Sequence, residues 1–170
     1  MDIKETIQKR YACRSYKNIP VPEDKIKSIL EAARLAPSAS NRQPYKFIIV
    51  KDKNTREKLA EAADGQNFIA SAPIIIVGVS LEPERVMGSD VPTYAVDLAI
   101  AMEHIALQAT AEGLGTCWIG AFSQQEVKDL LEIPEQYKVV ALMPLGYPAD
   151  SPKQKIRKDL KELVSYEKFK

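Results

Sequence analysis

Residues 93–112 read Thr-Tyr-Ala-Val-Asp-Leu-Ala-Ile-Ala-Met-Glu-His-Ile-Ala-Leu-Gln-Ala-Thr-Ala-Glu. The stretch is rich in Ala and lacks Gly and Pro, so it predicts a long helix. Gly113 and Gly115 follow it as C-terminal signals. Apolar side chains occupy most of the helix circumference, and a helix of that kind is buried. A chain of 170 residues has little else to surround such a helix, so burial within one chain and burial against a second copy both remain open.

Strands and further helices are expected on both sides of this helix. The apolar run at 74–79 is typical of a strand buried on both faces. Further strands are expected at 45–50, 116–121 and 138–145; helices at about 2–10, 22–36, 54–63 and 123–133, with Asp2, Asn54 and Ser123 as N-caps; and loops at 37–44 and 80–92. We therefore predict one α+β domain over residues 1–170, with a C-terminal arm at 149–170 whose end is too apolar to be left in water.

Charge is distributed unevenly along the chain. The totals are 24 Lys+Arg and 23 Asp+Glu, which gives no reason to expect a nucleic-acid partner. Residues 1–20 hold five basic and two acidic groups, residues 151–170 hold seven and three, and the middle of the chain is acidic. If the two ends meet in space, they form a site for a small anion. The alternative is two solvated tails.

The motifs in the sequence argue against several classes of protein. Cys13 and Cys117 are far apart and the chain has one His, so neither a metal site nor a disulfide framework is expected. No nucleophile motif and no dinucleotide fingerprint is present, so an enzyme of this sequence would rely on a cofactor. The longest apolar region, 94–111, contains Asp97 and Glu103 and no signal peptide is apparent; we expect a cytoplasmic protein with no membrane partner.

Four basic residues are candidates for an anion site. Arg10 and Arg14 are spaced i, i+4 at the end of the first predicted helix, which would point both side chains the same way. Lys155 and Arg157 form a second pair near the other end of the chain. Together with the Ser/Asn/Gln loop at 38–43, they could hold a phosphate and a polyol. Taken alone, such residues are more often solvated surface charges.

Four ordered blocks carry a resemblance to a known family. Arg-Tyr-Ala-Cys-Arg-Ser-Tyr at 10–16 comes first, followed by Ile-Leu-Glu-Ala-Ala-Arg-Leu-Ala-Pro-Ser-Ala-Ser-Asn-Arg-Gln-Pro-Tyr at 29–45, and then by the blocks at 113–122 and 145–148. In this order and spacing the chain resembles the FMN-dependent nitroreductase family. The resemblance implies a nitroreductase-like α/β sandwich with a central, mostly antiparallel sheet flanked by helices, assembled as an intertwined homodimer.

In that dimer, helix 93–112 would pack against its copy, FMN would bind at the subunit interface, and the arm at 149–170 would extend over the partner. The segment at 80–92 stands where longer members insert helices that cover the substrate, so the site should be comparatively open.

The resemblance also implies cofactor-binding residues. Arg10, Lys155 and Arg157 match the phosphate site, and Arg14 matches a cation near the pyrimidine end of the flavin. The remaining matched positions are Pro37, Ser38, Ala39, Asn41 and Gln43 on the partner's loop, Asn67, and Trp118, Ile119, Gly120 and Ala121, with the Gly120 and Ala121 amides facing flavin N5 and O4. Tyr11 and Ala12 also lie at the site, where the family usually has Arg and Ser; the missing hydroxyl would cost roughly 0.5–1.5 kcal/mol of FMN binding.

The implied activity is that of an FMN-dependent NAD(P)H oxidoreductase. NADH or NADPH would deliver a hydride to flavin N5, and a small-molecule acceptor such as a nitroaromatic or a quinone would then take it in a ping-pong cycle, with no catalytic side chain. The alternatives are a non-catalytic flavin-binding carrier or regulator, a cofactor-free dimeric scaffold, and a dehalogenase or flavin-fragmenting specialist. Trp118 could instead be a core aromatic, and Cys117 and His104 are expected to be structural.

Overall fold

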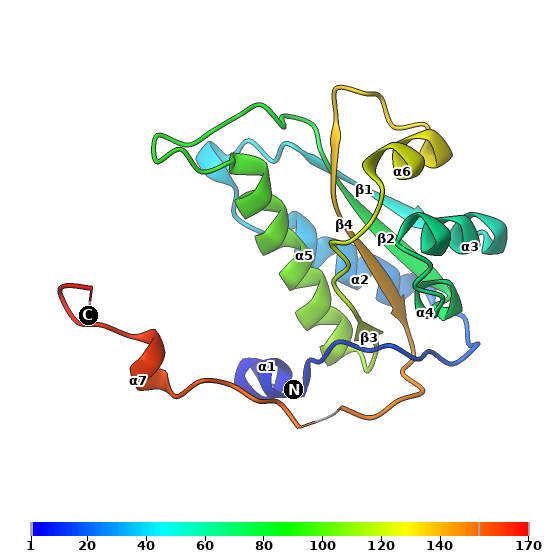
Figure 1. The fold of residues 1–170 in the computed structure, drawn as a ribbon. Coiled ribbons are helices and arrows are strands. Elements are labelled where there is room, and N and C mark those ends of the chain that lie inside the picture. The colour runs from blue at the N-terminus through cyan, green and yellow to red at the C-terminus, as the bar shows by residue number, and fades with distance from the viewer. Residues whose placement is uncertain (1, 153, 170) are drawn as a thin grey trace.

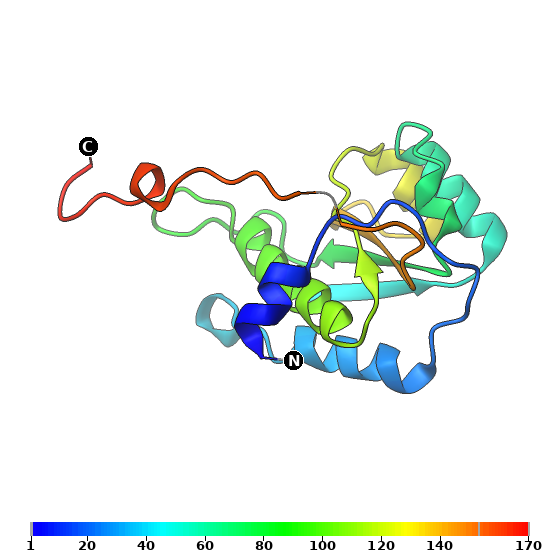
Figure 2. The same ribbon diagram turned by 90° about the horizontal axis from the view of Figure 1, so that it is seen from below.

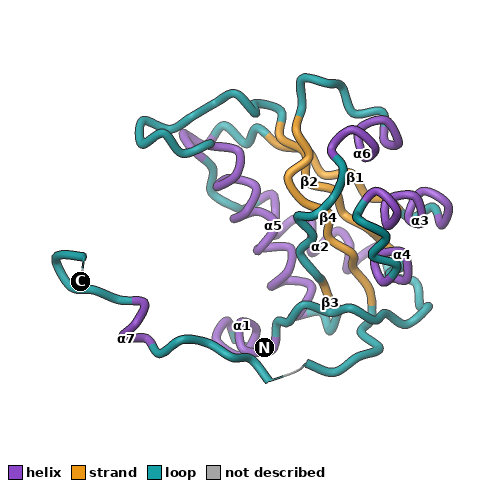
Figure 3. Tube along the Cα trace, in the orientation of Figure 1, coloured by secondary structure: helices purple, strands orange, loops and turns teal. Residues whose placement is uncertain are grey.

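The protein folds around a four-stranded antiparallel sheet with helices on both faces (Figures 1 and 3). The computed structural model describes residues 2–152 and 154–169. The strands are β1 (Tyr45–Val50), β2 (Ile74–Ser80), β3 (Gly115–Thr116) and β4 (Lys138–Gly146), in the order β1-β2-β4-β3. Ile76 of β2 lies opposite Ile49 of β1 and Met143 of β4, and a bulge follows Gly78. The predicted α+β class and antiparallel sheet are confirmed.

Two hydrophobic cores lie on opposite faces of the sheet, which Figure 2 shows between two helical layers. Helices α2 (Glu23–Arg34) and α5 (Thr93–Ala111) cover one face, and α3 (Lys53–Ala62), α4 (Phe68–Ser71) and α6 (Gln124–Leu131) cover the other. Ile74 and Ile76 of β2 point to the first core, whereas Ile75 and Val77 point to the second. Because β2 is central, its side chains are buried on both sides, as its apolar run predicted.

Helix α5 packs closely on β2. A side chain at Gly78 would place its Cβ 3.2 Å from Leu98 and 3.3 Å from Met102, so glycine lets the helix approach the strand. The helix ends at Ala111, and Gly113, with φ of +77°, follows its C-cap as the expected C-terminal signal. Only one face of α5 is buried within the chain; Val96, Ile100 and Leu107, among others, remain partly exposed.

The structure corrects three local predictions. The predicted strand 116–121 is reduced to the two residues of β3, and only Ile119 makes a further bridge, to Leu142 of β4. Asp52 rather than Asn54 caps α3, because its carboxylate accepts the N–H of Thr55 at 2.8 Å. Helix α1 (Ile3–Lys9), capped by Asp2 as predicted, ends before Arg14, so the i, i+4 argument for Arg10 and Arg14 is wrong.

The end of the C-terminal arm extends away from the rest of the molecule (Figure 1). It contains one short helix, α7 (Leu160–Leu163), that the sequence did not predict. Leu160 and Tyr166 are about four-fifths exposed and Phe169 is fully exposed, so these apolar side chains find no cover in the single chain. Among the described residues, no helix is long and apolar enough to cross a membrane.

Candidate functional site

The two ends of the chain meet beside β3. Ala12 pairs with Thr116 of β3 in parallel, and the N–H of Cys13 donates to the Thr116 carbonyl at 2.9 Å. On the other side, the N–H of Ala149 donates to the carbonyl of Ser15 at 2.8 Å. The segment after α1 is therefore held between β3 and the chain that leaves β4, so of the two alternatives left open by the charge distribution the structure shows the first, in which the two ends meet.

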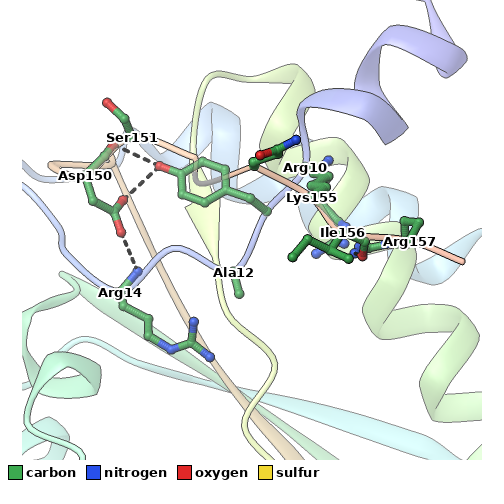
Figure 4. A pocket seen from close by; sticks show the side chains of 10 residues that line it. Arg10, Ala12, Arg14, Asp150, Ser151, Lys155, Ile156 and Arg157 are labelled. Carbon is green, nitrogen blue, oxygen red and sulfur yellow. Dashed lines mark hydrogen bonds between the residues drawn. The ribbon is translucent and has the colours of Figure 1, made fainter.

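A cavity of about 530 Å³ opens where these segments converge (Figure 4). Its volume falls within the range of small-molecule sites. It is lined by Arg10, Tyr11, Ala12, Arg14, Asp150, Ser151, Gln154, Lys155, Ile156 and Arg157. All four predicted cations are present, although Arg10 and Arg14 are brought there by an extended segment rather than by one helical face.

Positive charge is concentrated on the α1 side of the cavity. Burial lowers the pKa of Lys155, and the nearby charges of Arg10 and Arg157 lower it further. The Lys155 ammonium donates to the carbonyls of Ile7, at 3.3 Å, and Gln8 at the C-terminal end of α1, where a cation is favoured. A bound anion would stabilise the Lys155 ammonium beside the charges of Arg10 and Arg157.

Asp150 organises the opposite wall of the cavity. Its carboxylate accepts hydrogen bonds from the Tyr11 hydroxyl at 2.8 Å, the Cys13 thiol at 3.2 Å and the Arg14 N–H at 3.0 Å. Burial raises the pKa of Asp150, but these donors outweigh it and lower the pKa overall. Burial also raises the pKa of Cys13 to about 11, so this thiol is protonated at neutral pH. The sequence did not point to Asp150, because no local pattern indicates bonds to residues so distant in the chain.

Arg14 lies between the cavity and the segment after β3. Its guanidinium carbon is 5.9 Å from the centroid of the Phe68 ring. Burial raises the pKa of Cys117, while the charges of Arg14 and Arg10 act in the opposite direction, which places both arginines near the end of β3. Asn67 is exposed and directly precedes Phe68, so it lies on the Arg14 side of the molecule but does not line the cavity.

The segment 118–121 alternates between solvent and core. Trp118 is 42% exposed, so its interpretation as a core aromatic is wrong, whereas Ile119 is buried and bonded to Leu142. Gly120 and Ala121 are exposed, and their N–H groups donate to no other described residue. These two N–H groups lie next to the exposed Trp118 ring. They can donate hydrogen bonds to polar atoms on the edge of a bound ligand ring.

The loop at 37–43 lies elsewhere, at the N-terminal end of α5 (Figure 1). The N–H of Ala39 donates to Oδ1 of Asp97 at 3.0 Å, and the Ser38 hydroxyl accepts the N–H of Gln43 at 3.0 Å. Within one chain, Pro37, Ser38, Ala39, Asn41 and Gln43 therefore do not join the cavity.

His104 and Cys117 occupy structural positions in the described chain. Nδ1 of His104 lies 3.0 Å from the carbonyl oxygen of Ala32, which makes it a hydrogen-bonded residue between α5 and α2. Cys117 is buried, as expected of a structural cysteine. Across residues 2–152 and 154–169, no cluster of three or more His, Cys, Asp or Glu side chains could hold a metal ion.

Comparisons with known proteins agree with this architecture. A model of the nitroreductase family matches residues 7–74 and 64–147. An FMN reductase (NAD(P)H) of Bacillus subtilis strain 168 is 32% identical over 173 residues, covering 92% of this chain and 70% of the relative.

Two solved structures are similar in fold as well. A nitroreductase family protein from Clostridium novyi NT is 40% identical with a TM-score of 0.83, covering 91% of this chain and 89% of that one. An FMN-dependent nitroreductase from Clostridium difficile R20291 is 28% identical with a TM-score of 0.84, covering 96% and 98% of the two chains. The chain described here thus belongs to the nitroreductase family and is an oxidoreductase.

Proposed function

We propose that the protein is an FMN-dependent NAD(P)H oxidoreductase that passes reducing equivalents to electron-poor small molecules such as nitroaromatics or quinones. The observation that carries this proposal is the cavity at which Arg10, Lys155 and Arg157 converge from the two ends of the chain. Bound FMN would supply the hydride chemistry at its N5 atom, and the chain's own groups would bind and orient it.

The cavity fits the phosphate of a mononucleotide. Its three cations lie close enough for the charges of Arg10 and Arg157 to depress the pKa of Lys155, so a dianion would relieve their repulsion. Arginine suits this role because its fork of N–H groups can bond two phosphate oxygens at once. Tyr11 also lines the cavity, and the bond that its hydroxyl donates to Asp150 would fix its ring beside the cofactor.

The flavin ring would extend from the cavity toward β3. Arg14 would place positive charge near the pyrimidine end of the ring, where it stabilises the added negative charge of the reduced state. The free N–H groups of Gly120 and Ala121 would face N5 and O4, and the exposed Trp118 would border the ring, with Asn67 as a further contact from the α4 side. No protein side chain is assigned as a proton donor or nucleophile.

The site would be completed by a second copy of the chain. The loop at 37–43 lies too far along α5 to reach the cavity of its own chain, so it would approach the cavity of the partner. The partly exposed apolar face of α5 and the exposed Leu160, Tyr166 and Phe169 of the arm supply apolar surface for such a homodimer. A chain truncated after Lys158 keeps the cavity cations, and we expect it to be monomeric by light scattering where the full chain is dimeric.

The visible spectrum of the purified protein tests the activity. We expect flavin absorbance after reconstitution with FMN, bleaching on anaerobic addition of NADH or NADPH, and recovery on addition of a quinone. Flavin that binds but is bleached by neither nicotinamide would instead indicate a carrier. Protein that does not bind FMN would overturn the proposal.

A further inference from the structure

Asp97 is a carboxylate on the buried face of α5. It is 2% exposed, and one helical turn separates it from Thr93 on one side and Ala101 on the other, both buried. Taking a carboxylate out of water costs free energy unless hydrogen bonds compensate for the lost hydration. The presence of Asp97 in this apolar helix therefore needs a reason other than packing.

The carboxylate holds the loop at 38–43. Its Oδ1 accepts the N–H of Ala39, at the start of the short 3-10 turn Ala39–Asn41. This bond ties the inner side of the loop to α5, while on the outer side Arg42 pairs with Glu82 in an exposed contact. Asp97 is thus the buried anchor of the loop.

The loop needs such an anchor because its backbone is strained. Ser40, Asn41 and Gln43 all have φ between 53° and 54°, in the left-handed region that side chains other than glycine disfavour. Such conformations persist where surrounding contacts fix them, and they gather where a loop must meet a ligand.

The other half of the carboxylate is poorly satisfied. Oδ2 of Asp97 has no hydrogen-bond partner among the described residues, and neither has the Thr93 hydroxyl or the buried hydroxyl of Tyr45. Burial raises the pKa of Tyr45, and the charge of Asp97 raises it further, which places the two side chains close together. A buried carboxylate with one oxygen unbonded is a weak source of stability. What the fold gains from it is the position of Ala39.

We propose that Asp97 is a positioning residue, which acts through the Ala39 N–H to fix the loop at 38–43 in the shape that meets the flavin of the partner subunit. This inference rests on the function proposed above, because it assumes that the loop contacts FMN. It assigns to Asp97 an effect on cofactor affinity that is separate from fold stability.

The two roles separate in the variants Asp97→Leu and Asp97→Asn. Leu removes the acceptor for Ala39 and the buried charge together, so we expect the Kd for FMN to rise about tenfold or more while Tm stays the same or increases. Asn keeps an acceptor oxygen, so it should bind FMN as the wild type does. Ile75→Val, in the opposite core, is the control: it should lower Tm and leave the Kd unchanged.

Two results would overturn the proposal. One is Asp97→Leu binding FMN with wild-type affinity. The other is a loss of affinity that merely follows a loss of Tm, with Ile75→Val showing the same relation.

Amide hydrogen exchange in flavin-free protein gives a second readout. Asp97→Leu should accelerate exchange at Ala39 and through the loop to Gln43, without changing exchange in β2, whereas Asp97→Asn should not. Unchanged exchange at Ala39 would contradict the anchor itself. If the wild type binds no FMN, the proposed function fails, and exchange alone decides whether Asp97 holds the loop.

Discussion

The hydroxyl of Tyr11 lies 2.8 Å from Oδ1 of Asp150 and 3.0 Å from the carbonyl oxygen of the same residue. This pair joins two segments at opposite ends of the sequence. The resemblance described above implies an arginine at the position of Tyr11. The Tyr11 hydroxyl fixes Asp150, which lies at the start of the segment that brings Lys155 and Arg157 to the cavity.

Removing the Tyr11 hydroxyl should loosen this connection. We expect Tyr11→Phe to lower the free energy of unfolding by about 1 kcal/mol, because a partly exposed hydrogen bond to a carboxylate is lost. FMN affinity should fall severalfold as the segment after Asp150 gains freedom. Urea denaturation and fluorescence titration measure the two effects. Tyr137→Phe is the matched control, since the Tyr137 hydroxyl has no partner among the described residues.

Arg157 offers a test of phosphate recognition. It is exposed and donates a hydrogen bond to the carbonyl of its neighbour Ile156, so its loss should not disturb the fold. We expect Arg157→Ala to weaken FMN binding about tenfold or more and to leave riboflavin binding unchanged, because riboflavin lacks the phosphate. Arg34→Ala, which removes a surface arginine paired with Glu31 on α2, should alter neither titration. Equal weakening of both flavins by Arg157→Ala would contradict a phosphate contact.

The lowered pKa of Asp150 predicts a specific acid sensitivity. Because its pKa is lower in the folded chain than in the unfolded chain, the unfolded chain binds the proton more readily. The stabilisation is therefore complete above the ordinary Asp value of about 4 and is lost as pH falls below it. The urea midpoint of the wild type should fall more steeply below about pH 4 than that of Asp150→Asn. Parallel curves for the two proteins would argue against this assignment.

The N-cap of α3 can be checked with a pair of neighbouring variants. Asp52→Ala removes the acceptor for the Thr55 N–H, and we expect the urea midpoint to fall by about 0.5 M. Asn54→Ala changes an exposed residue inside the helix and should leave the midpoint within error of the wild type. If Asn54→Ala lowered the midpoint and Asp52→Ala did not, Asn54 would be the N-cap instead.

The main elements could be predicted because their signals are local. The apolar run of β2 and the Ala-rich sequence of α5 each predict burial directly. The basic residues at the two ends of the chain indicated an anion site. Asp52 and Asn54 are both good caps two residues apart, so sequence alone could not choose between them. The strand that begins at Gly115 is shorter than predicted because its regular pairing with β4 stops after Thr116, and only Ile119 bridges to β4 again.

The connections within the site were less predictable. Asp150 is bonded to Tyr11, Cys13 and Arg14 across almost the whole chain, and such pairs leave no periodic trace. Asp97 did leave a signal in the sequence, because it is a carboxylate within an apolar helix. Its hydrogen bond to Ala39 could be found only from the folded structure. The homodimer, the arm over the partner, the FMN contacts and the cytoplasmic location stay predictions.

The walls of the anion cavity are made at very different times during synthesis. Arg10 and Tyr11 leave the ribosome almost a whole chain before Lys155 and Arg157, and protein synthesis adds only about 5–20 residues per second. Both cores include side chains of β4, so they can be completed only after β4 has been made, shortly before the last cations of the cavity. The proposed capture of a phosphorylated cofactor would therefore be a late event, and we expect a product terminated near codon 150 to stay colourless.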